Sequence, residues 1–192
     1  MTLSSKVAPD GRRHLTRSWP GTGSTNRFSG LSDAHVHELF HQAMASLASG
    51  VAVITARRAD GHPCGLAATS VTSFSARPPS LLVCVSQESR CHRALSESER
   101  FGVHLMRSDE LELARVFAGK GDDKFAGVGW HWDGAVPELG GTLAYLRCRR
   151  TANFEHYDHT VLVGALEGGR IEEGEPLLYA RRRMDWLLRL GE

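Results

Sequence analysis

The sequence lacks a long apolar run and an excess of charge of either sign. No stretch approaches the roughly 18 consecutive apolar residues that a membrane-spanning helix needs, and the first residues lack the apolar core of a secretory signal. Lys and Arg number 23 against 22 Asp and Glu, which leaves a formal net charge of +1. No overall field therefore favours nucleic acid or an anionic membrane as a partner.

Paired cysteines are also missing. The four cysteines, Cys64, Cys84, Cys91 and Cys148, are scattered along the chain and form no C-x-x-C pair. Such spacing is typical of free, mostly buried thiols in a reducing compartment, and it argues against a disulfide scaffold. We therefore expect a cytoplasmic protein.

Several catalytic signatures are absent as well. No G-x-G-x-x-G follows a predicted strand, no G-x-S-x-G occurs, and the glycine-rich loop at Gly119–Gly121 lacks the Ser or Thr of a Walker motif. His35, His37 and His41 share a predicted helix, but their spacing does not bring them to one face. The sequence thus gives no support for a Rossmann domain, a serine hydrolase or a metal site.

The length of 192 residues is sufficient for one domain with a sizeable core. Residues 1–31 are rich in Ser, Gly, Arg and Pro and have no hydrophobic period, so we expect a flexible N-terminal tail. Residues 32–192 then form the folded domain. Its first element is a helix that starts at Ser32 or Asp33, carries apolar residues at helical spacing, and stops at Gly50.

The rest of the chain consists mainly of short apolar segments separated by turn residues. Asp60-Gly61 is a good two-residue hairpin turn, and the continuous apolar run Leu81–Val85 suggests a strand buried on both faces. Two further helices are predicted, one over Ser89–Leu95 and one that Ser108 caps and that runs to Phe117. The predicted strands are Val51–Arg57, Leu66–Thr72, Leu81–Val85, Phe101–Met106, Leu143–Arg149, Val161–Leu166 and Pro176–Tyr179. This pattern favours a mainly β (α+β) fold, a β-barrel with a few short helices.

Small hydroxyl residues are concentrated in the segment Gly65–Ser75, which reads GLAATSVTSFS. Such residues let the backbone approach a ligand closely while still offering hydrogen-bond donors to a phosphate or a heteroaromatic ring. The alternative is a strand and turn whose hydroxyls face solvent, because Thr and Val are ordinary strand residues. The segment alone leaves both interpretations open.

Six blocks taken together, in this order and spacing, resemble one family. They are FHQAMASLASGVAVIT, GLAATSVTSFSARPPSLLVCV, FGVHLM, FAGKGDDKF, DHTVLVG and PLLY. The sequence resembles the flavin reductase component of two-component, flavin-diffusible monooxygenases, which folds as an FMN-binding split barrel. The resemblance covers residues 39–188, about four fifths of the chain.

The resemblance implies a site for FMN or FAD. It implies backbone and hydroxyl contacts along the flavin from the following residues: Ala67, Ala68, Thr69, Ser70, Thr72 and Ser73. Ser86, Ser89 and Arg90 follow the apolar strand and open a predicted helix, where unpaired N–H groups favour an anion such as the flavin phosphate. An ordinary helix cap by Ser89 is the alternative.

Two further segments match the family pattern. In the loop Asp123-Lys124-Phe125, Lys124 is a candidate second phosphate contact and Phe125 a candidate for packing over the flavin ring, although a solvated loop with one buried Phe is the plainer interpretation. Asp158-His159 matches the pair that lines the nicotinamide side of the flavin, so His159 is our candidate catalytic residue. The family usually has Gly where Tyr157 stands, and this departure leaves the shape of the nicotinamide entrance undecided.

The function that the resemblance implies is hydride transfer from NADH or NADPH to a diffusible flavin. Hydride passes directly between the two cofactors, so the protein needs to position them rather than to supply a strong acid or base. The expected partners are a separate flavin-dependent oxygenase and a second copy of the chain in a homodimer. Two alternatives remain at this stage: an FMN oxidase of the pyridoxamine-phosphate type, and a non-catalytic flavin- or haem-binding split barrel.

Overall fold

The computed structural model describes residues 5–7, 13–15, 32–121 and 123–188. The chain divides into two compact units, a terminal unit of Met1–Ser49 with Leu178–Glu192 and a central unit of Gly50–Leu177. Most of the segment expected to be a flexible tail lies outside the described residues. Its flexibility and its boundary at residue 32 therefore stay predictions.

The helix of the terminal unit is α1 (Asp33–Ser46), which follows Ser32 as the N-cap residue, as predicted. It ends at Leu47, earlier than the predicted stop at Gly50. The Ser32 hydroxyl makes no capping bond to the backbone and lies instead 3.0 Å from Nδ1 of His35. None of the side chains of α1 is buried.

The terminal unit also contains strands that the sequence pattern did not predict. The single predicted C-terminal strand is a hairpin of β13 (Leu178–Ala180) and β14 (Arg183–Leu187). β14 pairs in parallel with β2 (Arg13–Leu15), and β2 pairs antiparallel with β1 (Ser5–Val7). The turn of the hairpin places Arg181 and Arg182 at positive φ, and both residues are exposed.

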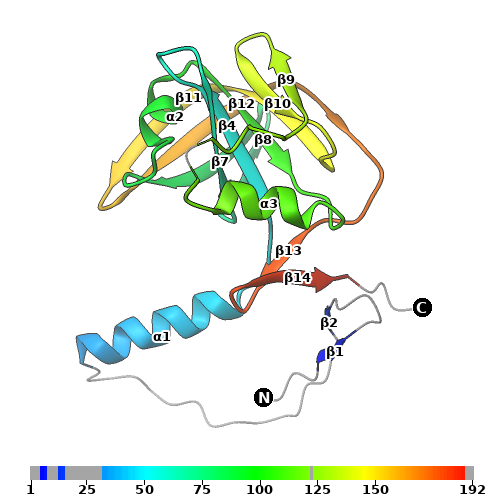
Figure 1. Ribbon diagram of the computed structural model, residues 1–192. Coiled ribbons are helices and arrows are strands. Elements are labelled where there is room, and N and C mark those ends of the chain that lie inside the picture. The colour runs from blue at the N-terminus through cyan, green and yellow to red at the C-terminus, as the bar shows by residue number, and fades with distance from the viewer. Residues whose placement is uncertain (1–4, 8–12, 16–31, 122, 189–192) are drawn as a thin grey trace. The chain divides into compact units, whose positions relative to one another are not determined.

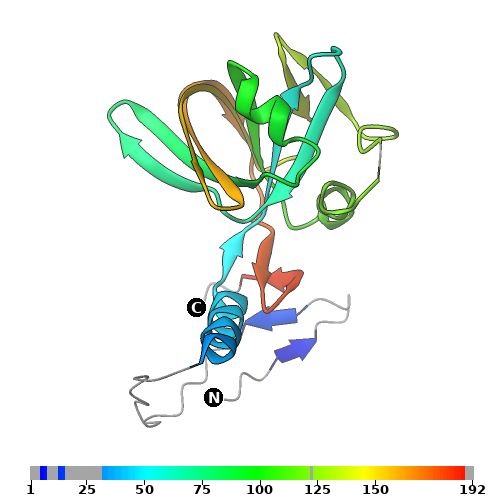
Figure 2. The same cartoon turned by 90° about the vertical axis from the view of Figure 1, so that its left-hand side faces the viewer.

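The central unit is built on one seven-stranded sheet in which every neighbouring pair is antiparallel. Figures 1 and 2 show this sheet twisted and curled on itself. In sheet order the strands are β5 (Pro63–Ala68), β4 (Ala52–Arg57), β8 (Arg100–Leu105), β11 (Ala144–His156), β12 (His159–Ile171), β7 (Pro79–Ser86) and β6 (Thr72–Ala76). The expected mainly β class is confirmed, and the sheet is an open, split barrel rather than a closed one.

Ser70 brings together two parts of the curled sheet. The predicted strand Leu66–Thr72 is interrupted after Ala68, and the chain loops through residues 69–71 before β6 begins. The Ser70 hydroxyl accepts a hydrogen bond from the Cys84 N–H at 3.1 Å and donates one to the Cys84 carbonyl at 3.0 Å. A side chain thus replaces a missing strand partner for β7, because buried backbone groups must be paired.

The expectation that Leu81–Val85 is buried on both faces is wrong. Burial alternates along β7, so that Leu81, Val83 and Val85 lie in the core while Leu82 and Cys84 are only partly buried. The core of the unit also holds Ile54, Leu95, Phe101 and Leu162. An apolar run indicates two-sided burial only when both faces of the sheet are covered, and here the second face of β7 is only partly covered.

Other elements also differ from the sequence prediction. β11 and β12 extend well beyond their predicted apolar segments, because they continue as a paired ribbon whose outer residues are mostly exposed. A hairpin of β9 (Trp130–Asp133) and β10 (Val136–Leu139) had not been predicted. α3 (Leu111–Ala118) has Glu110 rather than Ser108 as its N-cap residue. Within the described residues, no helix combines the length and the apolar character needed to cross a bilayer.

Candidate functional site

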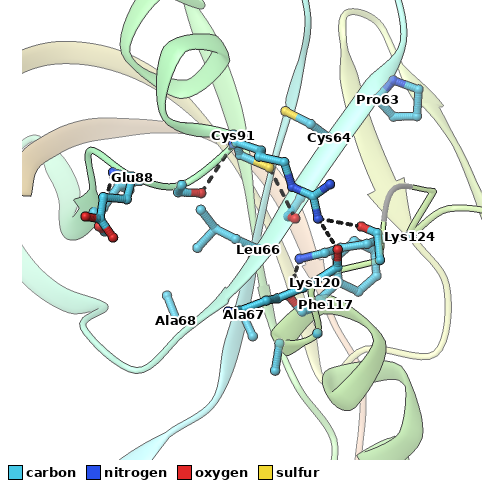
Figure 3. Close-up of a pocket in the computed structure, with 18 of the residues that line it drawn as sticks. Pro63, Cys64, Leu66, Ala67, Ala68, Glu88, Cys91, Phe117, Lys120 and Lys124 are labelled. Carbon is cyan, nitrogen blue, oxygen red and sulfur yellow. Dashed lines mark hydrogen bonds between the residues drawn. The ribbon is translucent and has the colours of Figure 1, made fainter.

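A cavity of about 1070 Å³ lies in the central unit. Its walls are formed by β5 and the loop after it, the end of β7, the turn of residues 86–91, the end of α3, and the loop that follows α3 (Figure 3). Pockets for small molecules and cofactors usually have volumes of about 300–1,000 Å³, so this cavity is large enough for a nucleotide-sized ligand.

The wall formed by β5 is lined with small residues. A Cβ atom at Gly65 would lie 2.6 Å from the ring of Phe117, which shows that α3 packs directly on the backbone of β5 at this point. Ala67 and Ala68 continue the strand along the cavity and pair with β4 in regular register. The small side chains thus serve two purposes: they let α3 approach β5, and they leave space beside the strand.

The segment of small hydroxyl residues is only partly at the cavity. Thr69 and Ser70 line it, together with Ala67 and Ala68, but the Ser70 hydroxyl is already bound to the backbone of Cys84. Thr72 and Ser73 do not line it, because they lie exposed on β6, opposite the half-buried Leu82 and the buried Leu81 of β7. The break after Ala68 separates the two groups.

The turn after β7 differs from the predicted helix start. α2 (His92–Glu97) begins after Cys91 and has 6 residues, so the helix over Ser89–Leu95 was placed too early. The Ser89 hydroxyl accepts the Cys91 N–H at 3.2 Å, and the Ser86 hydroxyl accepts the Glu88 N–H at 3.3 Å. Ser86 and Ser89 both line the cavity, but as parts of a turn rather than of a helix N-terminus.

Arg90 and Lys124 bring positive charge to the cavity. The Arg90 guanidinium donates to the carbonyls of Lys120 and Gly121, the latter at 2.9 Å, and so holds the loop after α3 against the turn (Figure 3). Lys124 Nζ donates to the Phe117 carbonyl at 2.7 Å. Partial burial lowers the pKa of Lys124 below its ordinary value, and the nearby Arg90 charge acts in the same direction.

Phe125, the residue after Lys124, forms part of an aromatic cluster. It is 6% exposed and packs edge-to-face against Phe117 and Trp130, with ring centroids 5.1 and 5.2 Å apart. The Asp123 carboxylate accepts the backbone N–H groups of Phe125 and Ala126, which fixes the loop. The three residues Asp123, Lys124 and Phe125 therefore have separate structural partners.

His159 lies at the first position of β12, directly opposite Ser86 of β7, and lines the cavity. Its Nδ1 is 2.9 Å from Oδ1 of Asp158, and this hydrogen bond lowers the pKa of the Asp158 carboxyl. Asp158 does not line the cavity. Its backbone carbonyl accepts the Gln87 N–H at 2.9 Å, so it ties β12 to the turn and orients His159.

Three of the four cysteines line the cavity, although their spacing in the sequence indicated no role at a site. Cys64 is on β5, Cys84 is on β7, and Cys91 directly precedes α2. The only sequence signal was that Cys91 follows Arg90, a candidate phosphate contact. Residues so far apart in the chain come together only through the curl of the sheet.

A model of the flavin reductase like domain matches residues 44–188. The chain belongs to this family. The resemblance that the six sequence blocks indicated is therefore confirmed. The match covers the whole central unit, and so all residues that line the cavity.

The relatives of this flavin reductase-like chain include named reductases. The reductase component of 4-nitrophenol 4-monooxygenase/4-nitrocatechol 2-monooxygenase from Rhodococcus opacus is 36% identical over 144 residues, which are 75% of this chain and 77% of the relative. A flavin reductase (NADH) from Kitasatospora aureofaciens is 37% identical over 150 residues, 76% and 78% of the two chains. The crystal structure of a flavin reductase domain protein from Arthrobacter sp. FB24 superposes with a TM-score of 0.76 at 30% identity, covering 81% of this chain and 98% of that one.

Tyr157 marks the departure from the family pattern, and the backbone shows why glycine is usual there. Tyr157 and Asp158 form the turn between His156 and His159, which pair across β11 and β12. Tyr157 has a φ of 50°, in the left-handed region where side chains other than glycine are strained, and it is 88% exposed.

Replacement of Tyr157 by glycine should therefore be tolerated and should stabilise the central unit slightly. Relief of the left-handed strain, roughly 1 kcal/mol, is partly offset by the greater freedom of glycine in the unfolded chain. Urea unfolding of Tyr157→Gly should give an unchanged or slightly higher midpoint. Tyr157→Ala, which keeps the strain without the ring, serves as the control. A fall of more than about 1 kcal/mol in both variants would show that the Tyr157 ring itself stabilises the fold.

Proposed function

We propose that this protein is an NAD(P)H:flavin oxidoreductase that reduces FMN or FAD and supplies free reduced flavin to a separate flavin-dependent monooxygenase. The observation that carries the proposal is one cavity with two cations on one side and His159 beside Ser86. Family membership supports the same reaction, since relatives are named as NADH-dependent flavin reductases and as reductase components.

The cavity fits a flavin nucleotide in size and in the chemistry of its lining. Figure 3 places Lys120 and Lys124 on one side and Ala68 and Glu88 on the other. Lys124 and Arg90 would hold the phosphate, because charged N–H donors make the strongest hydrogen bonds to anionic oxygens. Ala67, Ala68 and Thr69 would lie along the ring system, where small side chains permit close approach. Thr72, Ser73 and Asp158 do not line the cavity, so any role of theirs in flavin binding would be indirect.

A bound flavin supplies the hydride-accepting group, so the protein needs to position both cofactors and exclude competing reactions. We propose that His159 orients the nicotinamide ring, because its imidazole lines the cavity and is held by Asp158. Ser86 lies opposite His159 in the β7–β12 pair and adds a hydroxyl on the same side. None of these residues needs to transfer a proton for hydride to move.

The role of His159 can be tested by alanine replacement. His159→Ala should raise the KM for NADH several-fold or slow hydride transfer, while flavin affinity stays within about twofold of the wild type, since the imidazole contacts the nicotinamide rather than the flavin phosphate. His156→Ala is a matched control, because His156 pairs with His159 but does not line the cavity. Complete inactivity with normal binding of both cofactors would assign His159 a chemical role instead.

The reaction itself separates the proposal from its rivals. With NADH, air and catalytic FMN or FAD, the purified protein should oxidise NADH and release hydrogen peroxide from the reduced flavin. Addition of a flavin-dependent oxygenase should convert peroxide formation into hydroxylated product. Conversion of an organic substrate by the protein alone would favour an FMN oxidase. Tight flavin binding without NADH oxidation would favour a non-catalytic carrier.

We also propose a homodimer located in the cytoplasm. The apolar residues Val36, Leu39, Phe40 and Met44 of α1 are each more than 40% exposed in the single chain, which is unusual for large apolar side chains on one helix. A second copy of the chain could cover them. Light scattering at micromolar concentration should give twice the mass of the chain, and a monomer would contradict this part of the proposal.

A further inference from the structure

Two thiols meet at the wall of the cavity. Cys64 on β5 is 3% exposed and Cys91 is 6% exposed, and both line the cavity. The Cys91 thiol is 3.2 Å from the carbonyl of Gly65, the neighbour of Cys64. Figure 3 shows both sulfur atoms beside β5, and each thiol shifts the pKa of the other. The two cysteines are 27 positions apart in the sequence but are neighbours in space.

The surroundings make the two thiols unequal. The neighbouring Cys64 thiol, together with the positive charges of Lys124 and Arg58, lowers the pKa of the Cys91 thiol. The neighbouring Cys91 thiol, together with burial, raises the pKa of the Cys64 thiol. Of the two, Cys91 is the thiol whose surroundings favour ionisation. A thiolate paired with a neighbouring thiol is the arrangement found at redox-sensitive sites.

Arg58 adds an independent feature to this cluster. It lines the cavity, and its Nε is a buried donor without a hydrogen-bond partner among the described residues. A buried N–H group without a partner costs free energy, and an additional oxygen acceptor near the thiols would satisfy it. An oxidised sulfur carries such an oxygen.

We propose that Cys91 and Cys64 form a peroxide-oxidisable thiol pair, with Cys91 as the attacking thiolate and Cys64 as the resolving thiol. The Cys91 thiolate attacks one oxygen of hydrogen peroxide, the O–O bond breaks, and Cys91 sulfenic acid and hydroxide form. The Cys64 sulfur then attacks the sulfenic sulfur, and a disulfide forms as water leaves with the Cys64 proton. In sum, two thiols and one hydrogen peroxide give one disulfide and two waters.

The geometry favours this reaction. A disulfide requires its sulfur atoms to approach to about 2.05 Å. The Cys91 sulfur already lies 3.2 Å from the carbonyl oxygen of Gly65, the residue that follows Cys64 in β5. The cavity gives peroxide a route to both sulfurs, although each residue is nearly buried. Peroxide is also what the reaction proposed above forms when no oxygenase takes the reduced flavin, but the oxidation itself needs only peroxide and does not depend on that function.

The test uses the full chain without flavin or nicotinamide, so that its outcome does not depend on reductase activity. After treatment with a modest excess of hydrogen peroxide, alkylation should detect two of the four free thiols. Peptide mapping should identify an intramolecular Cys64–Cys91 disulfide that dithiothreitol reverses. Before oxidation, alkylation of Cys91 should reach half its maximal rate below the ordinary thiol midpoint of about pH 8.5.

Variants separate the two roles and provide controls. In Cys64→Ser the oxidised Cys91 has no resolving thiol, so dimedone should trap it as sulfenic acid. Cys148→Ser should form the disulfide like the wild type, because Cys148 is buried away from the cavity and burial raises its pKa to about 12. The proposal is overturned if Cys64 and Cys91 stay alkylatable while Cys84 or Cys148 is oxidised, or if the disulfide links two chains. Mapping of the wild type decides the question even if a variant fails to fold.

Discussion

Replacement of Lys124 by methionine is expected to weaken FMN binding about ten- to a hundredfold and to change riboflavin binding by less than about threefold. A hydrogen bond to a charged group contributes roughly 1.5–3 kcal/mol, which corresponds to this range of affinity. Only FMN carries the phosphate that Lys124 would hold. Methionine keeps most of the volume of the half-buried side chain and removes the charge. Fluorescence titration of both flavins measures the difference directly.

Arg115→Met is the matched control for this experiment. Arg115 lies on α3, is exposed, pairs with Glu112 and does not line the cavity, so its loss should leave both flavins unaffected. Arg90 provides a less selective test, because its guanidinium also holds the carbonyls of Lys120 and Gly121. Its loss would loosen the loop as well as remove a charge. Equal weakening of FMN and riboflavin in Lys124→Met would show that Lys124 supports the loop rather than the phosphate.

Stability is expected to fall steeply as the pH is lowered from about 6.5 toward 3, and His104 is the cause. This residue is fully buried, and burial lowers its pKa to about 3, with the Arg170 charge acting in the same direction. Its Nδ1 donates to the Val53 carbonyl at 3.1 Å, and its Nε2 accepts the Leu139 N–H at 3.1 Å. The two hydrogen bonds together require the neutral ring.

The direction of this pH dependence follows from the number of protons that the folded and the unfolded chain bind. Between pH 6.5 and 3 the unfolded chain binds a proton at this histidine and the folded chain does not, so acid favours unfolding. A difference of one bound proton changes the free energy of unfolding by about 1.4 kcal/mol for each pH unit. Between pH 6.5 and 3 the free energy of unfolding therefore falls by several kcal/mol. Above pH 6.5 the histidine is neutral in both states, and its contribution no longer depends on pH.

Urea unfolding at a series of pH values measures this slope. His104→Gln retains one donor and one acceptor without a titrating ring, so its free energy of unfolding should fall less steeply below pH 6.5 than that of the wild type. Its stability at pH 7 will be lower, because the amide does not reproduce the stacking of His104 on Tyr145. His37→Gln, on the exposed face of α1, should keep the wild-type slope. Parallel slopes for the wild type and His104→Gln would assign the acid sensitivity to other groups.

Much of the local structure could be predicted because it depends on residues that are neighbours in the chain. The hairpin between β4 and β5 turns at Asp60-Gly61, as predicted, with Gly61 at a φ of 87° and the Asp60 carboxylate accepting the His62 N–H. Its loop is longer than the predicted two residues, because residues 59–61 lie between Arg58 and His62, whose backbones are hydrogen-bonded. The strand predicted over Val51–Arg57 is β4, and the one over Phe101–Met106 is β8, within a residue at each end. The alternation of apolar and polar residues, the turn residues and the apolar runs indicate the positions of such strands and turns directly.

The sequence predictions were wrong where the burial of a residue depends on parts of the chain that are distant in sequence. The run Leu81–Val85 looks the same whether one face or both faces are covered, and only the arrangement of the sheet leaves Cys84 at the cavity. The break after Ala68 could not be placed, because its cause is the Ser70 contact with Cys84, 14 positions away. The candidate site residues were predicted from the family resemblance. In the structure, Thr72, Ser73 and Asp158 do not line the cavity.

The sequence by itself determined the fold class, the family and some of the segments that line the cavity, because periodicity, turn chemistry and six ordered blocks are properties of the chain alone. Only the tertiary structure decided which side chains face the cavity, which cations already hold a loop, and which two cysteines lie together at the cavity wall. The physical reason is the curl of the open sheet. It brings β5, the turn after β7 and the loop after α3 to one place, and no local pattern encodes contacts between segments so far apart in the chain.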